Sequence, residues 1–193
     1  MARTPSTMLE LGTEAPAFTL PDFDGVPHSL ADFATAPALL VAFICSHCPF
    51  VRHIRAEFAR MAREYQGRGL AVVAINANDF IAYPQDGPDA MRAEALELGY
   101  PFPYLVDGTQ AVAKAYRAAC TPDFYLFDAA RRLVYRGQFD DSRPGTEHSV
   151  TGADLRAGVE AVLDGRAPAA GQRPSLGCNI KWQPGNEPDY YGD

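Results

Sequence analysis

The chain has 193 residues, of which 47% are hydrophobic and 21% charged, and its formal net charge at pH 7 is −7. These values are ordinary for a globular protein with one domain and a sizeable core. The acidic balance and the lack of a Lys/Arg-rich run argue against nucleic acid or an anionic membrane as a partner. No stretch is long and apolar enough to span a membrane, and residues 1–12 lack the apolar core of a secretory signal. We therefore expect a cytoplasmic protein.

The amino-terminal part of the chain predicts short elements. Residues 1–11 are expected to be flexible. Residues 18–20 predict a short strand, and Asp24-Gly25 predicts a turn. Ser29 and Asp32 have the spacing of a capping box, which indicates a short helical turn.

The most informative stretch covers residues 39–65. Residues 39–44 form an uninterrupted apolar run, typical of a strand buried on both faces. After Pro49 the apolar side chains recur at helical spacing, and arginines occupy the other side. Pro49 fits the first turn of a helix, where backbone N–H groups lack intrahelical partners. Cys45 and Cys48 therefore lie at the junction between a buried strand and the N-terminus of a helix.

This junction predicts redox chemistry. A helix N-terminus favours a thiolate and lowers the pKa of a cysteine from its usual value of about 8.5. The spacing lets the two sulfurs meet, so Cys45-x-x-Cys48 at a strand–helix junction is typical of a redox-active dithiol/disulfide pair. A protonated His47 would add a positive charge beside the pair. The alternative is two small buried cysteines beside a histidine.

The rest of the chain alternates strands and helices. A second buried strand parallel to the first implies a right-handed β-α-β crossover. In order, we expect a strand at 70–75, a loop at 76–88, a helix at 89–98, a strand at 103–106, a helix at about 109–116, an antiparallel hairpin at 124–127 and 132–136, a helix ending at Gly165, and an irregular tail at 166–193.

Three pieces of the sequence together resemble the thioredoxin fold over residues 12–165. They are Cys45-Ser46-His47-Cys48-Pro49, the Thr121-Pro122 dipeptide ahead of a strand, and the segment 15–33. The last piece is similar to the subgroup that unites the peroxiredoxins (alkyl hydroperoxide reductase and thiol-specific antioxidant proteins) with the thioredoxins of cytochrome maturation.

The resemblance implies an α/β fold with a central mixed sheet flanked by helices. Residues 1–11 would form an N-terminal extension, and the irregular tail 166–193 would pack on the domain. Pro122 would be cis and would lie against the cysteine pair. It would leave nearby backbone groups available to pair with a substrate chain.

Two departures from the resemblance favour disulfide exchange over peroxide reduction. Peroxiredoxins have a T-x-x-C pattern, and here Cys45 stands at the position of their Thr and Cys48 at that of their Cys. They also carry an Arg just before the late strand, where this chain has Pro122. Thioredoxin itself has Trp before its first Cys, where this chain has Ile44, so its own set of partners is not implied.

The leading hypothesis is a thiol–disulfide oxidoreductase. Cys45, expected to be the more exposed cysteine, would attack a partner disulfide as a thiolate, and Cys48 would resolve the mixed disulfide. His47 would favour the Cys45 thiolate. Pro49, Thr121 and Pro122 would support the site. The expected partners are protein or small-molecule disulfides and a cellular thiol reductant, with no cofactor, no metal, no nucleic acid and no membrane.

Two alternatives stay open. In a thiol peroxidase with antioxidant activity, Cys48 would react with peroxide and Cys45 would resolve the product. In a copper- or zinc-binding protein, the two cysteines would form a soft ligand set with His47 and His53.

Cys120 and Cys178 add possibilities at the same site. Cys120 precedes Thr121-Pro122, so in this fold it should lie near the active pair, either as a buried inert thiol or as a third redox cysteine. Cys178 lies in a tail that would fold back over the site, anchored by Ile180 and Trp182. It would then form a disulfide with Cys120 or act as an extra resolving thiol.

Overall fold

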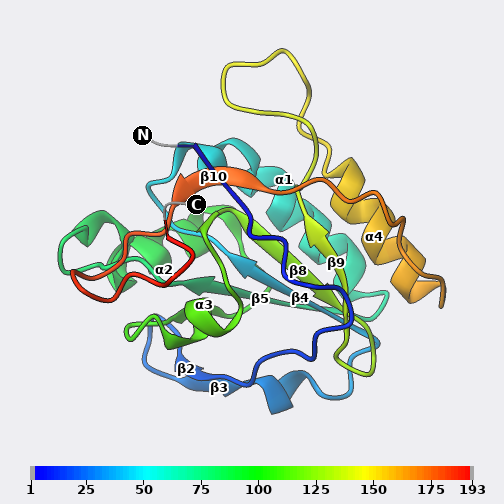
Figure 1. The fold of residues 1–193 in the computed structure, drawn as a ribbon, viewed down its shortest axis with the longest axis horizontal. Coiled ribbons are helices and arrows are strands. Elements are labelled where there is room, and N and C mark those ends of the chain that lie inside the picture. Colours follow the sequence, from blue (N-terminus) through cyan, green and yellow to red (C-terminus); the bar gives the residue numbers. More distant parts are fainter. Residues whose placement is uncertain (1–2, 192–193) are drawn as a thin grey trace.

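A five-stranded mixed sheet forms the centre of the computed structural model, which describes residues 3–191 (Figure 1). Its strand order is β6-β5-β4-β8-β9, in which β4, β5 and β6 run parallel to one another, β8 runs antiparallel to β4, and β9 runs antiparallel to β8. The strands are β4 (Ala38–Phe43), β5 (Leu70–Asn76), β6 (Tyr104–Val106), β8 (Asp123–Phe127) and β9 (Leu133–Gly137).

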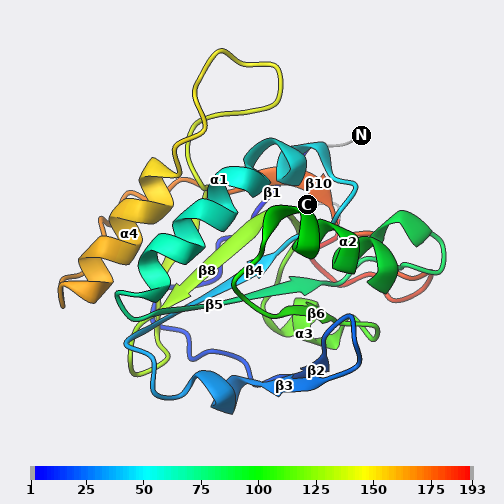
Figure 2. The same cartoon turned by 180° about the vertical axis from the view of Figure 1, so that it is seen from behind.

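Helices and short elements cover the sheet on both sides. Helices α1 and α4 lie side by side on one face, and α3 lies with the hairpin of β2 and β3 on the other (Figure 2). The helices are α1 (Pro49–Gln66), α2 (Pro88–Leu98), α3 (Ala111–Ala115) and α4 (Ala153–Leu163). The short elements are β2 (Thr19–Pro21), β3 (Pro27–Ser29) and the 3-10 turns η1 (Leu30–Phe33) and η2 (Pro84–Asp86).

The central strand β4 explains why the fold has two cores. Every residue of β4 is buried, and successive side chains of a strand point to opposite faces. Leu40 and Ala42 therefore pack in the core beneath α1, α2 and α4, whereas Leu39 and Val41 pack in the core beneath α3 and the N-terminal segment. This double burial confirms the prediction of an uninterrupted apolar strand in a mixed sheet flanked by helices.

A second, three-stranded sheet joins both ends of the described chain. Strand β10 (Leu176–Asn179) lies between β1 (Arg3–Pro5) and β7 (Cys120–Thr121), antiparallel to both. The segment 166–191 is otherwise mostly irregular, and residues 3–5 of the N-terminal extension pair as a strand. Residues 1–2 of the expected extension and 192–193 of the expected tail lie outside the described residues. The sequence pattern did not predict β1 or β10, because both are short and contain a Pro or a Gly.

Within residues 3–191, no helix combines the length and the apolar character that a membrane span requires.

Replacing Phe58 with Ala should destabilise the domain. Phe58 is buried on α1 and contacts the rings of Phe102, Phe124 and Phe139 at centroid distances of 5.3, 5.5 and 6.2 Å. We expect Phe58→Ala to lower the free energy of unfolding by about 3–5 kcal/mol, measured by urea denaturation. Leu96→Ala is the control, because Leu96 is 77% exposed and should change stability by less than about 0.5 kcal/mol. Equal losses in the two variants would contradict this account of the core.

Candidate functional site

The two cysteines of the C-x-x-C segment lie between β4 and α1, as the sequence predicts. Cys48 is the N-cap residue of α1 and Pro49 is its first helical residue. Cys45 and Cys48 are 1% and 0% exposed, so the expected difference in exposure between them is absent. In this conformation a reaction partner reaches neither sulfur from bulk solvent.

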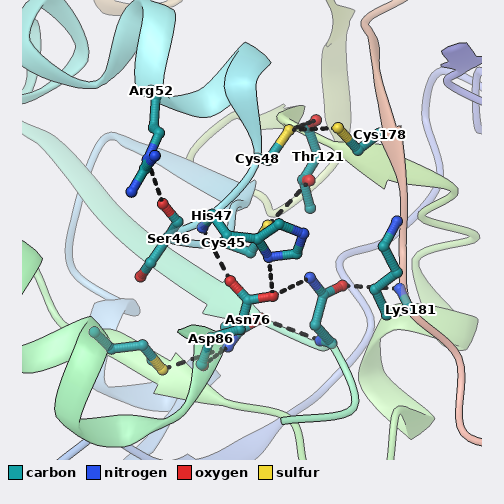
Figure 3. Close-up of polar contacts among 12 residues, drawn as sticks. Cys45, Ser46, His47, Cys48, Arg52, Asn76, Asp86, Thr121, Cys178 and Lys181 are labelled. Atoms are coloured by element: carbon teal, nitrogen blue, oxygen red, sulfur yellow. Dashed lines mark hydrogen bonds and ion pairs between the residues drawn. The ribbon is translucent and has the colours of Figure 1, made fainter. Parts of the chain in front are cut away.

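Thr121, in β7, contacts the sulfurs of both Cys45 and Cys48. The Thr121–Pro122 peptide bond is cis, which confirms the expectation. The Thr121 hydroxyl oxygen lies 3.4 Å from Cys45 Sγ, and its carbonyl oxygen lies 3.1 Å from Cys48 Sγ (Figure 3). Strand β7 thus brings both the side chain and the backbone of Thr121 against the cysteine pair.

Cys178 completes a cluster of three sulfurs. Its Sγ lies 3.0 Å from Cys48 Sγ, and Thr121 lies against the sulfurs of both Cys48 and Cys45 (Figure 3). In the antiparallel register of β10 and β7, Cys178 stands opposite Thr121. The resemblance implied that backbone groups beside Pro122 would be available to a substrate chain. Here β10 already pairs with them, so that expectation is corrected.

Cys120 is not part of this sulfur cluster. It is fully buried, and its Sγ lies 3.6 Å from the carbonyl oxygen of Pro122. Burial, together with the charge of Asp123, raises its pKa well above the usual value and so favours the thiol. The Cys178 sulfur contacts Cys48, which favours Cys48 over Cys120 as its disulfide partner. This environment supports the interpretation of Cys120 as an inert thiol.

The electrostatics of the cluster favour a thiolate at Cys48. Hydrogen bonds from the thiols of Cys178 and Cys45 lower the pKa of Cys48, and the backbone N–H of Val51 in the first turn of α1 adds to them. The pKa of Cys45 is raised well above its usual value by its hydrogen bond to Cys48, by burial and by the charge of Asp86. The sequence placed the thiolate on Cys45. The difference arises because hydrogen bonds from Cys178 and Cys45 stabilise charge on Cys48, whereas the hydrogen bond to Cys48, burial and Asp86 disfavour charge on Cys45.

Asp86 is the residue of the site that the sequence analysis missed. It is fully buried, and its carboxylate lies 2.5 Å from His47 Nδ1 and accepts the His47 backbone N–H at 3.0 Å (Figure 3). Asn78 donates to the same carboxylate at 2.8 Å, and Asn76 donates to the Asp86 carbonyl at 2.6 Å. A protonated His47 is therefore paired with Asp86, which offsets the help that its charge would give a Cys45 thiolate.

The possible metal ligands that lie together differ from the expected set of two cysteines with His47 and His53. Ligand atoms of Cys45, His47 and Asp86 lie within 4.8 Å of one another. His53 instead has its Nε2 3.1 Å from Ser142 Oγ, in a hollow lined by Phe50 and Asp140. Within this group, His47 Nδ1 and the Asp86 carboxylate are hydrogen-bonded to each other.

Together, a C-x-x-C at the start of a helix and a cis-proline strand beside it define a thioredoxin-fold redox protein. The thioredoxin domain of a thiol-disulfide oxidoreductase from Bacteroides vulgatus has this fold, with a TM-score of 0.59 at 17% identity over 78% of this chain and 99% of that domain. Residues 11–136 match the AhpC/TSA family, and the chain belongs to that family.

Relatives of the chain support a redox enzyme. A Mycobacterium tuberculosis protein named as a peroxiredoxin is 30% identical over 115 residues, which are 60% of this chain and 68% of the relative. The thiol-disulfide oxidoreductase ResA of Geobacillus thermodenitrificans is 25% identical over 127 residues, 65% of this chain and 67% of the relative. The solved structure of a hypothetical protein of Sinorhizobium meliloti is 57% identical, with a TM-score of 0.93 over 94% of this chain and 100% of that one.

Replacing Asp86 with Asn should lower the pKa of Cys45. The negative charge of Asp86 disfavours a second negative charge on the Cys45 sulfur, so its removal makes the thiolate easier to form. The measurement is thiolate absorbance against pH in a background where the other three cysteines are Ser. Asp140→Asn is the control, because Asp140 is a buried carboxylate that hydrogen-bonds Thr151 and Gly152. An unchanged or raised Cys45 pKa in Asp86→Asn would contradict the assignment.

Proposed function

We propose that this protein is a thiol–disulfide oxidoreductase that cycles Cys45 and Cys48 between a dithiol and a disulfide. The observation that carries the proposal is the position of the two cysteines at the N-terminus of α1, with Thr121 against both sulfurs. A C-x-x-C pair at a helix N-terminus is suited to this chemistry, because the thiolate form is stabilised and the second thiol lies within reach.

The pKa directions favour Cys48 as the attacking sulfur. The Cys48 thiolate forms a bond with one sulfur of a partner disulfide, and the other partner sulfur leaves as a thiolate. Cys45 then gives its proton to that thiolate and attacks Cys48, which releases the second partner sulfur and closes the Cys45–Cys48 disulfide. Two electrons pass from the protein to the partner, and a cellular thiol reductant returns the protein to the dithiol. No cofactor takes part in this exchange.

The burial of the site narrows the choice of partner. The sulfurs of Cys45 and Cys48 are buried. A partner disulfide must therefore either be small or displace β10, which packs against Thr121 and Cys48. Small-molecule disulfides and exposed protein disulfides both belong to this proposal, as does a cytoplasmic location, where free thiols are maintained.

A thiol peroxidase is the second candidate. The lowered pKa of Cys48, which stands at the position of the peroxiredoxin Cys, favours it, as does the Mycobacterium tuberculosis relative. The Pro122 in place of the peroxiredoxin Arg argues against it, because that position supplies no cation to a reacting peroxide oxygen. We therefore place disulfide exchange first.

Oxidation of a Cys178→Ser variant in glutathione buffers should join Cys45 to Cys48. Serine keeps a hydrogen-bond donor at position 178 while removing the competing sulfur. We expect a two-electron transition. Alkylation and peptide mass mapping at each buffer potential measure it. Cys120→Ser added to this variant should leave the transition unchanged, whereas Cys48→Ser should abolish it. If Cys45 and Cys48 stay alkylatable at every buffer potential, the proposed function is wrong.

Peroxide should oxidise the protein more slowly than a small disulfide at equal concentration. The reason is the missing cation at position 122, which would otherwise stabilise charge on the leaving oxygen. Rapid mixing with a chemical trap for sulfenic acid at Cys48 measures the peroxide reaction, and Cys48→Ser gives the background rate. A faster reaction with peroxide would move the peroxidase ahead of the oxidoreductase.

A further inference from the structure

We propose that Cys178 is a third redox residue of this site, which takes the disulfide over from Cys45 by pairing with Cys48. This inference rests on the proposed function, because it needs Cys48 to form a disulfide with Cys45 first. It goes beyond the proposed function by giving Cys48 two alternative disulfide partners, Cys45 and Cys178. The residue that makes the choice possible comes from β10, at the far end of the chain.

The first support is the position of the sulfur. Cys178 Sγ lies 3.0 Å from Cys48 Sγ, compared with about 2.05 Å in a disulfide, so a small movement closes the bond. Cys178 is 2% exposed and Cys48 is 0% exposed, so the two sulfurs meet in a space from which water is excluded. Cys48 lies against both Cys45 and Cys178, as the hydrogen bonds from those two thiols require.

The second support is the way β10 is built to bring the sulfur there. A Cβ on Gly177 would lie 1.9 Å from the carbonyl oxygen of Thr121, so only glycine allows β10 to approach β7 this closely. The neighbouring residue, Cys178, then stands opposite Thr121 and reaches Cys48. Ser175 fastens the strand through a hydrogen bond to the Gly137 carbonyl at 2.6 Å. Gly177 and Ser175, on the N-terminal side of Cys178, thus hold β10 close enough to β7 for the Cys178 sulfur to reach Cys48.

The proposed step conserves electrons and protons. The Cys178 sulfur loses its proton and attacks Cys48 Sγ in the Cys45–Cys48 disulfide. The Cys48–Cys178 bond forms, the Cys45–Cys48 bond breaks, and the Cys45 sulfur leaves and takes up one proton. The protein remains oxidised by two electrons throughout, so no external oxidant or reductant enters the step.

The charges around the cluster are consistent with this direction. The main cause that raises the pKa of Cys178 is its hydrogen bond to Cys48, and that cause disappears once Cys48 is in a disulfide. The charge of Lys181, which lowers the pKa of Cys178, remains. Cys45 faces the Asp86 carboxylate, which favours its return to a protonated thiol. The product state ties β10 covalently to the start of α1 and restores the Cys45 thiol.

The first test uses single cysteine replacements in the full chain. After oxidation by diamide, we expect Cys45→Ser to contain an internal Cys48–Cys178 disulfide, found by alkylation and peptide mass mapping. Cys178→Ser should contain a Cys45–Cys48 disulfide instead. If Cys178→Ser forms its disulfide but Cys178 stays fully alkylatable in Cys45→Ser, this inference is wrong and the proposed function stands. If Cys178→Ser forms no disulfide, the proposed function itself fails.

The second test keeps all four cysteines and moves the strand. Gly177→Ala should slow formation of the Cys48–Cys178 disulfide by about a hundredfold, since a misplacement of about 1 Å can cost that much. Gly171→Ala is the matched control in the same segment, because a Cβ there meets nothing within 4 Å. The Cys45–Cys48 disulfide should still form in both variants, which also reports that the domain is folded. Equal rates of Cys48–Cys178 formation in the two variants would overturn the role given to β10.

Discussion

The Cys48 sulfur at the N-terminus of α1 is the point on which the chemistry of this protein depends. This sulfur contacts Cys178 Sγ and the Thr121 carbonyl oxygen, and its pKa is lowered by hydrogen bonding with Cys178 and Cys45 and by the backbone N–H of Val51 in the first turn of the helix. A buried negative charge is costly unless several donors satisfy it, and here Cys45 and Val51 come from the stretch around Cys48 while Cys178 comes from the far end of the chain. The pKa of Cys48 is lowered while those of Cys45 and Cys178 are raised, so the cluster shares one negative charge and places it on the middle sulfur.

That arrangement depends on β4 in turn. Its residues are buried on both faces, which fixes the strand in the middle of the sheet and fixes the place where α1 begins. Strand β8 pairs with β4 so that Phe43 stands opposite Asp123, the residue after Pro122. The end of β4 and the cis-proline peptide are therefore held at the same edge of the sheet. A shift of this register by one residue would turn every side chain of β8 to the other face, so the core and the site are fixed together.

The parts of the site that could be predicted from the sequence are those encoded locally. The apolar run before Cys45, the helical spacing after Pro49 and the Thr121-Pro122 dipeptide each lie within one short stretch, and the structure shows the corresponding strand, helix and cis peptide. Asp86 and β10 could not be predicted in the same way. Asp86 lies in a polar loop whose composition predicts only a turn, and its role depends on where the loop folds against His47. The spacing predicts a thiolate on Cys45 because it does not reveal that Cys178 reaches Cys48 from the far end of the chain or that Asp86 lies near Cys45.

Strand β10 also changes what the cis-proline edge can do. An unpaired strand edge offers its backbone to any chain that can add to it, but here the edge formed by Thr121 is occupied by a segment of the same protein that carries its own cysteine. A tethered strand has a high effective concentration at its site, so an external polypeptide must compete with it. In the proposed exchange, the stability of β10 against local opening would set how readily a protein disulfide reaches Cys48, whereas a small disulfide would need a smaller opening. The same strand would then control both access to the buried sulfur and the choice of its disulfide partner.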